Sequence, residues 1–427
     1  MTVLKWTGLV LAGLVALALL VLGISWAMPI PAAERAALEM MEAPPAARPP
    51  QANAFAAVWL LPYDGIPSAQ WEALVAEDAG RFREPASAHR PGISVADERF
   101  AAVTRDTTWC RQGASCLAQV KTHADEVAAA HQGHEALHER IAALSGYRYY
   151  RNAFDLDPGV PFPQMAMVLE RTPALALAHV RGDSALALQG VCEDVSSARM
   201  LMSDSDMLLV AMVGGAWAER SAALFTDILA ELPADVAVPP VCTRAFLPPQ
   251  LAELDLCQPM RGEFAFQQTA MVQLSGSEQL LLDKRKTLAR NAWLLSRSCA
   301  DDVQAQIRQD QRVKLAPPPS VWDLSCVANA VGCTLVDIAG PAYDQYPRRM
   351  QDVGAQLRMA GAMLWLRGQP HSEGGAAEVL AGLPSELGSA ERPLRISDDG
   401  KRVQVPRLGP PREGWEPTVS AALPMGW

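Results

Sequence analysis

The chain has 427 residues, half of them hydrophobic, and carries a formal net charge of −10 at pH 7. An acidic chain lacks the cationic surface that attracts nucleic acid or anionic lipid, so we expect neither as a partner. Its length allows a sizeable buried core, arranged as two subdomains or as one elongated array.

An uncharged apolar run, WTGLVLAGLVALALLVLGISWA, occupies residues 6–27. As a helix it would be about 33 Å long, enough to cross a hydrocarbon core of about 30 Å. Lys5 and the amino terminus precede this run, whereas Glu34 and Glu39 follow it. The positive-inside rule therefore places residues 1–5 in the cytoplasm, and we predict a single transmembrane anchor at 6–27 with the rest of the chain exported.

The competing interpretation is a cleaved signal peptide, because Ser25-Trp26-Ala27 resembles a small-x-small cleavage site. The apolar run is longer than the core of a usual signal peptide, which favours the uncleaved anchor. A second apolar stretch, at 207–217, is too short to span a membrane and is predicted to be a buried core helix.

Alanine and proline dominate residues 28–53, which we predict to be a semi-rigid stalk between membrane and body, with a short helix at its centre from Glu34 to Glu42. The body is then divided into an N-terminal helical subdomain at 54–160 and a main helical domain at 161–390. The remaining residues, 391–427, are predicted to form a β-hairpin and a Pro-rich tail.

All eight cysteines lie beyond the apolar run, as expected for disulfides formed in an oxidising compartment. They are Cys110, Cys116, Cys192, Cys242, Cys257, Cys299, Cys326 and Cys333. The short spacings favour the pairs 110/116, 326/333 and 242/257, which leaves Cys192 for Cys299. Many other connectivities stay open, because spacing alone does not fix the pairing. The chain contains no C-x2-C pair, which argues against a zinc site formed by cysteines.

The composition also indicates a source and a compartment. Arginine outnumbers lysine by 31 to 6, and alanine, leucine and proline are abundant, as in proteins from GC-rich bacterial genomes. Together with the apolar run and the cysteines, this composition predicts a bacterial inner-membrane protein whose body lies in the periplasm.

Apolar residues recur at steps of three and four along most of the body, which predicts a mainly α-helical fold. Helical segments are expected at 117–144, at 163–232 with breaks near 182 and 204, at 262–312, and at 320–337 and 343–367. No fixed repeat period is present, so we expect an irregular α-helical array with the character of an α-solenoid.

The C-terminal part differs in pattern. Residues 393–397 and 401–405 are β-prone and flank Asp-Asp-Gly, which predicts a small β-hairpin. The Pro- and Gly-rich chain after Arg407 is expected either to wrap the surface, with Trp415 and Trp427 as contacts, or to be mobile.

Aromatic residues are concentrated in the segment YRYYRNAF at 147–154. We interpret the segment as an aromatic plug between helices, with a partner-binding surface flanked by Arg148 and Arg151 as the alternative. Two pairs of acids, 155/157 and 204/206, are interpreted as a turn and as helix caps rather than as calcium or glycosidase sites.

One motif carries a specific chemistry. Residues 134–138 have the sequence His-Glu-Ala-Leu-His, an HExxH pattern that places His134 and His138 on one face of a helix. This pattern resembles that of the zincin-type metallopeptidases. The resemblance implies a bound Zn with His134 and His138 as ligands and Glu135 as the general base.

The resemblance covers five residues only, and the chain departs from the family pattern around them. Glu139 directly follows the second histidine, and no further Gly and His ligand motif comes after it. A third ligand would have to be a distant carboxylate such as Glu170 or Asp155. His123 and His131 extend the same face, and the competing interpretation is a solvated helix face.

These observations predict a non-enzymatic protein that acts by binding another periplasmic protein. Three roles fit: an accessory factor for secretion or envelope assembly, a membrane-anchored folding factor, and an immunity protein. The alternative is the zinc metallopeptidase.

Overall fold

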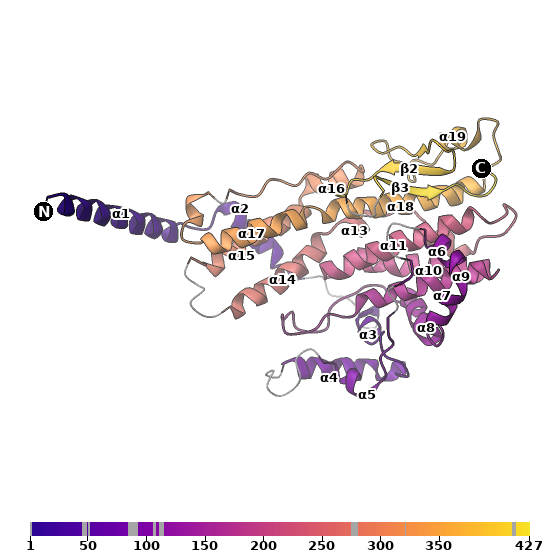
Figure 1. The fold of residues 1–427 in the computed structure, drawn as a ribbon, viewed down its shortest axis with the longest axis horizontal. Helices are drawn as coiled ribbons and strands as arrows, with labels where there is room; N and C mark the ends of the chain where they lie inside the picture. Colours follow the sequence, from indigo (N-terminus) through magenta and orange to yellow (C-terminus); the bar gives the residue numbers. More distant parts are fainter. Residues whose placement is uncertain are drawn as a thin grey trace.

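The computed structural model describes residues 2–44, 49, 52–83, 93–105, 108–110, 115–274, 281–320, 322–411 and 416–427. The described chain is mainly helical and ends in one small antiparallel sheet (Figure 1), as the sequence predicts. The α-helices are α1 (Thr2–Ala27), α2 (Ala32–Met41), α3 (Phe55–Trp59), α4 (Trp71–Arg83), α5 (Val95–Arg99), α6 (Cys116–Thr122), α7 (Ala124–Ala130), α8 (Glu135–Ala143), α9 (Arg171–Val180), α10 (Ser184–Ser203), α11 (Leu208–Leu229), α12 (Pro240–Ala245), α13 (Leu251–Leu254), α14 (Cys257–Gln273), α15 (Lys284–Ser296), α16 (Asp301–Arg308), α17 (Ala330–Tyr343), α18 (Tyr346–Arg367) and α19 (Gly375–Leu380). Short 3₁₀ helices are η2 (Ser68–Gln70), η3 (Leu144–Gly146), η4 (Met165–Glu170), η6 (Arg297–Cys299) and η7 (Leu324–Cys326).

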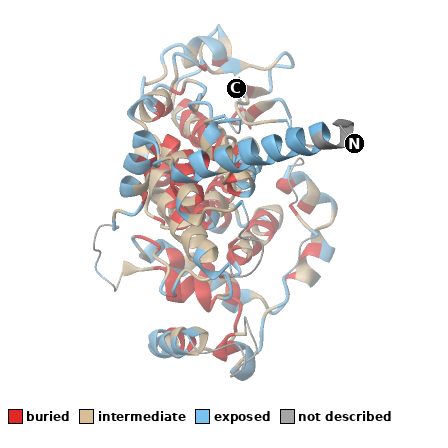
Figure 2. Ribbon diagram, turned by 90° about the vertical axis from the view of Figure 1, so that its left-hand side faces the viewer, coloured by how far each residue is buried: buried red, intermediate tan, exposed pale blue. Residues whose placement is uncertain are grey.

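Among the described residues, two helices are long and apolar enough to cross a membrane, and they differ in burial. Helix α1 projects from one end of the body, and most of its described side chains are exposed (Figures 1 and 2). Helix α11 lies in the centre of the body, with Trp217, Phe225 and Ile228 fully buried. The prediction that residues 207–217 belong to a buried core helix is therefore confirmed.

Helices α10, α11 and α18 form the centre of the molecule, where buried residues are concentrated (Figure 2). Helix α11 packs between the other two, and α14 and the sheet also contact it. Gly214 allows α10 to approach closely, because a Cβ there would lie 2.9 Å from the Cβ of Leu201. The buried hydrophobic cluster is continuous from Ala37 in α2 to Leu423 after the last strand. A division of the body at residue 160 stays a prediction.

The predicted stalk is partly replaced by a packed helix. Residues 32–41 form α2, which lies against α15 and buries Ala37 and Met41. The short helix expected at 34–42 is therefore present. It begins after Pro31, and the prolines that end it begin only at Pro44. The stalk residues 45–48 and 50–51 lie outside the described residues, as does Trp415.

The helical segment predicted at 117–144 is present as three short helices. His123 separates α6 from α7, and Gly133, with φ +84°, separates α7 from α8. Glycine accepts this left-handed backbone conformation without strain, so the chain turns immediately before the HEALH motif. The breaks predicted near 182 and 204 coincide with the ends of α9 and α10.

The segment at 147–154 is an aromatic plug, and the alternative of a binding surface is wrong. Tyr150 and Phe154 are 0% and 6% exposed. The ring of Phe154 lies 4.8 Å from the rings of both Phe55 and Trp59, in edge-to-face contact.

The acids at 204 and 206 hold this plug in place instead of capping the N-terminus of α11. Asp204 accepts a 2.7 Å hydrogen bond from Arg151, and Asp206 accepts the backbone N–H of Asn152. Met207 stands at the start of α11 without a side-chain cap. The prediction that these acids cap α11 is therefore wrong. Asp157 accepts the N–H of Gly159 in a turn, as predicted.

The predicted hairpin is present as β1 (Arg395–Ile396) and β2 (Arg402–Pro406), with Gly400 in the turn at φ +70°. A third strand, β3 (Thr418–Ala422), pairs antiparallel with β2, so that Gln404 faces Ser420. The tail after Arg407 thus completes a three-stranded sheet, which corrects the two-stranded hairpin predicted from the sequence. Trp427 packs against His371, with 4.4 Å between the ring centroids.

All eight cysteines form disulfides, and two of the predicted pairings are confirmed, namely Cys110–Cys116 and Cys326–Cys333. The other two predicted pairings, 242/257 and 192/299, are wrong. The structure pairs Cys192 with Cys242 and Cys257 with Cys299. The first bond joins α10 to α12, and the second joins α14 to η6, which are contacts between helices that spacing in the sequence does not reveal.

Candidate functional site

The HEALH motif lies at the start of α8. His134 is the residue before the helix, and His138 is in its first turns. Their ring centroids are 6.4 Å apart, and the ring of His131 lies 5.9 Å from His134 and 5.4 Å from His138. The structure therefore groups three of the histidines that the sequence places on one face. His123 is not in this group and contacts Glu126 at 3.2 Å.

The environment of His138 favours its uncharged ring. The pKa of His138 is lowered to about 4 by burial and by the positive charge of His131, His134 and Arg171. Glu135, the proposed general base, is exposed and accepts the N–H of Gly133 at 3.4 Å. Hydrogen bonds from its own backbone N–H and from that of Gly133 lower the pKa of Glu135, which makes its carboxylate a weaker base.

The carboxylates suggested as a third zinc ligand are engaged elsewhere. Glu170 forms an ion pair with Arg105 at 3.0 Å, and Asp155 forms one with Arg83 at 2.8 Å. Over the described ranges, no three His, Cys, Asp or Glu side chains are arranged to hold a metal ion. Among the described residues, this group therefore lacks a carboxylate placed to complete a metal centre.

A second site lies where α1 joins the body. The ammonium group of Lys286 in α15 donates hydrogen bonds to the carbonyl oxygens of Ser25 and Trp26, at 2.8 and 2.9 Å. The backbone N–H of Ala328 donates to the Ser25 hydroxyl at 2.8 Å. The last carbonyls of a helix lack intrahelical partners, and a lysine there also complements the helix dipole. These bonds fix the end of α1 against α15 and the segment before α17.

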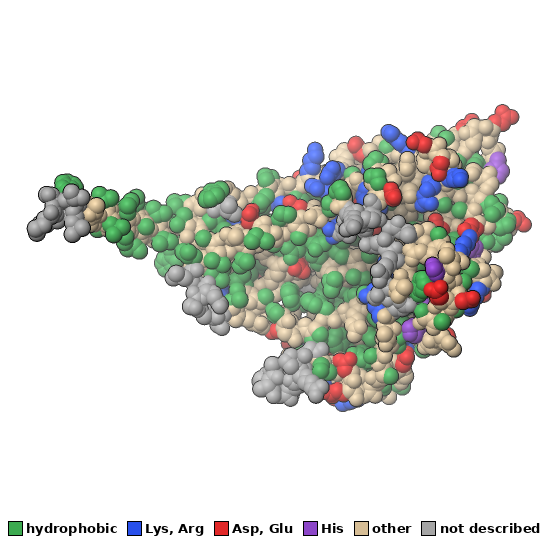
Figure 3. Space-filling view, viewed as in Figure 1, with side chains coloured by type: hydrophobic (Ala, Val, Ile, Leu, Met, Phe, Trp, Pro, Cys, Tyr) green, Lys and Arg blue, Asp and Glu red, His purple; other side chains and the backbone are tan. Residues whose placement is uncertain are grey.

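Exposed apolar side chains continue from α1 onto the body. Val331, Leu335 and Ile338 follow one face of α17 at steps of four and three residues, and they are 40%, 49% and 71% exposed. We call these three residues the α17 stripe. Trp322, in the segment before α17, is 93% exposed. Figure 3 shows hydrophobic side chains gathered at the end of the body from which α1 projects.

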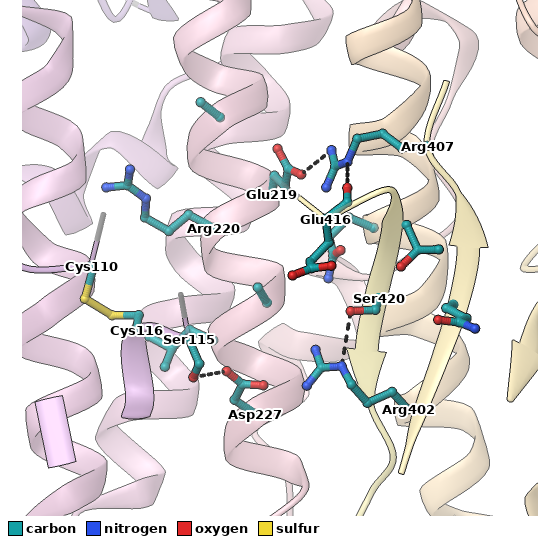
Figure 4. Close-up of a pocket in the computed structure, with 16 residues that line it drawn as sticks. Cys110, Ser115, Cys116, Glu219, Arg220, Asp227, Arg402, Arg407, Glu416 and Ser420 are labelled. Atoms are coloured by element: carbon teal, nitrogen blue, oxygen red, sulfur yellow. Dashed lines mark hydrogen bonds and ion pairs between the residues drawn. A yellow bond between two sulfur atoms is a disulfide. The ribbon is translucent and has the colours of Figure 1, made fainter. Parts of the chain in front are cut away.

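A third site is a cavity of about 520 Å³ between α11, the sheet and the 110–116 disulfide, which we call the α11 cavity (Figure 4). One face of α11 lines it, and Arg402 and Gln404 of β2 and Thr418 and Ser420 of β3 line the opposite side. These strand residues alternate with the buried Val403 and Val419, because successive side chains of a strand point to opposite faces.

Charged side chains from distant parts of the chain meet in the α11 cavity. Arg407 forms an ion pair with Glu219 at 3.1 Å, and Asp227 accepts a 2.7 Å hydrogen bond from Ser115. Burial raises the pKa of Asp227, which the Ser115 hydroxyl and the charge of Arg402 oppose. The Nε of Arg402 donates to Ser420 at 3.1 Å.

No sequence motif marks this cavity. Its visible signal is the charged residues 219, 220 and 227, which interrupt an otherwise apolar helix at helical spacing. The opposite wall comes from strands almost 200 residues later, so the sequence alone does not bring the two together. A comparison of the chain with protein-family models, with curated proteins and with solved structures found no match.

Proposed function

We propose that this is an exported bacterial protein held at the inner membrane by α1, and that its disulfide-bonded body acts without catalysis by binding another protein of the envelope. The α17 stripe beside α1 is the observation that carries the proposal. Paired cysteines support an oxidising compartment, which for this composition is the periplasm.

The position of the stripe favours a partner that is itself close to the membrane. An apolar helical face of this kind, with residues at steps of three and four, is the surface against which a second helix packs. Because Lys286 and Ala328 fix α1 next to the segment before α17, a partner on the stripe would lie beside the anchor. A membrane-anchored component of a secretion or envelope assembly meets this requirement, and an immunity protein would use the same surface against a toxin.

The test is site-specific photo-crosslinking of the full chain in its native cell. A photoreactive residue at Ile338 should give a discrete adduct with a protein, whereas one at Leu186, which is 56% exposed on α10, should not. Ile338→Glu should abolish the adduct formed from a photoreactive residue at Leu335, without unfolding the protein, because the substituted side chain is exposed. Adducts with lipid alone, or equal protein adducts at both positions, would refute binding at the stripe.

The zinc metallopeptidase is the second candidate, and the grouping of three imidazoles is the observation that favours it. Metal analysis of purified full-length protein separates the two proposals. A peptidase should retain about one zinc per chain and lose it in His134→Ala and His138→Ala, whereas His371→Ala should keep it. Protein that is folded and free of zinc after exposure to the metal would end this candidacy.

A further inference from the structure

The α11 cavity contains a cationic group without a direct partner in the described structure. Arg220 lines it from α11, on the side of Cys110 (Figure 4), and among the described residues its guanidinium makes no hydrogen bond or ion pair. Glu170 and Glu219 attract its charge, but each already forms an ion pair, with Arg105 and with Arg407. A half-buried guanidinium without a direct ion-pair partner is costly unless an anion joins it.

A second polar group in the cavity is also left unmatched. Gln356 of α18 is 3% exposed and lines the cavity, and its side-chain Nε2 has no hydrogen-bond partner. A buried amide donor without an acceptor costs about 1–3 kcal/mol, so such groups are normally satisfied. The same cavity thus offers a cation and a neutral donor that both need an acceptor.

The volume of the cavity and its other lining residues limit the size and polarity of a ligand. A volume of about 520 Å³ lies in the range of small-molecule sites. Gln404, Thr418 and Ser420 supply neutral donors and acceptors along the sheet wall, and Ala216, Ala223 and Leu224 supply apolar contact along α11.

From these observations we propose that the α11 cavity binds a small polar molecule that carries an oxyanion, with Arg220 holding the charge and Gln356 donating a hydrogen bond to it. Arg220 is planar and presents several N–H donors, which suits the two oxygens of a carboxylate or phosphate. The neutral wall then contacts the amide or hydroxyl groups of the same molecule. This site is separate from the α17 stripe, so either proposal can fail alone.

The test is calorimetric titration of the full chain in detergent with matched probes. The probes are N-acetyl-dialanine and its C-terminal amide, glucuronate and glucose, and inorganic phosphate. At least one anionic probe should bind saturably, and for the peptide or the sugar acid the neutral counterpart should bind at least tenfold more weakly. The probe that binds shows whether the oxyanion comes from a peptide carboxylate, a sugar acid or a phosphate.

Variants connect the binding to the cavity. Arg220→Gln should weaken the best anion at least tenfold, Gln356→Leu should weaken it several-fold, and Arg285→Gln, an exposed arginine on α15, should leave it unchanged. Arg220→Lys keeps the charge and should retain part of the affinity, which covers the case in which Arg220→Gln does not fold. Failure of all anionic probes to bind, or full affinity in a folded Arg220→Gln, would overturn the proposal.

Discussion

At the scale of single residues, His138 ties the stability of the fold to pH. Its pKa is about 4 in the folded protein and about 6.5 when unfolded, so the fold favours the neutral ring. Its contribution is complete above pH 6.5 and is lost as the pH falls towards 4. We expect the free energy of unfolding to drop by about 1–2 kcal/mol from this residue between pH 7 and pH 5.

Denaturant titration at the two pH values checks this expectation. The drop should be smaller by that amount in His138→Gln and unchanged in His371→Gln, an exposed histidine. Burial raises the pKa of Asp194 to about 7 and of Asp206 to about 6, so these acids stabilise the fold as the pH falls. Their effect is common to all three proteins and cancels in the comparison. A pH dependence that His138→Gln leaves unaltered would contradict the assignment.

Arg392 holds together the last third of the chain. It is 5% exposed and donates hydrogen bonds to Asp310 at 2.8 Å and to Asp352 at 3.0 Å. It also donates to the backbone carbonyls of Gln351 and Pro406, the last residue of β2. The side chain therefore links the segment after α16, helix α18 and the sheet.

Removal of this arginine leaves Asp310 with Arg358 alone, and Asp352 with Arg407 alone at 4.0 Å, so two buried carboxylates lose most of their ion pairing. We expect Arg392→Ala to destabilise the protein by about 3–5 kcal/mol, measured by chemical denaturation. Arg395→Ala, three residues further on and exposed, should cost no more than about 0.5 kcal/mol. Equal stability of the two variants would show that Arg392 is not needed to hold these segments.

At the scale of elements, the four disulfides fall into two classes. Cys192–Cys242 and Cys257–Cys299 close loops of 50 and 42 residues, whereas Cys110–Cys116 and Cys326–Cys333 close loops of 6 and 7. A crosslink restricts the unfolded chain more when its loop is longer.

The long-range bonds should therefore matter more. Replacing both cysteines of the 192–242 pair by serine is expected to lower the free energy of unfolding by about 4 kcal/mol, against about 2 kcal/mol for the 326–333 pair. Thermal and chemical unfolding of the two double variants measures the difference. A larger loss of unfolding free energy for the 326–333 pair would mean that this local disulfide stabilises the folded state and does not act only by restricting the unfolded chain.

The elements differ in how well the sequence predicts them. Periodicity predicts α9, α10, α11 and α18 because their apolar faces are buried continuously. It does not predict β3, because TVSAA is short and follows a Pro- and Gly-rich segment. The wrong disulfide pairings have a related cause: the approach of α10 to α12 depends on tertiary packing, which spacing in the sequence does not report.

The candidate sites show the same limit at the scale of the whole molecule. The HEALH motif is visible in the sequence, yet its chemistry depends on Gly133 turning the chain before α8 and on distant carboxylates that pair with arginines. The α11 cavity has no motif, because its walls come from α11, α18 and the sheet. Local patterns thus identify elements reliably, whereas sites are made by contacts between elements.

The proposed arrangement of the whole molecule has a direct test in its topology. All eight cysteines are paired in the fold, so denatured protein from intact cells should take up a maleimide only after reduction. Protease should digest the body in spheroplasts and spare it in intact cells, because an exported body lies outside the inner membrane.

The mass of the purified protein should include residues 6–27 if α1 is an anchor, and a shorter chain beginning at Met28 would identify it as a cleaved signal. Free thiols together with a protease-resistant body would instead place the molecule in the cytoplasm, and the α17 stripe would then need a cytoplasmic partner.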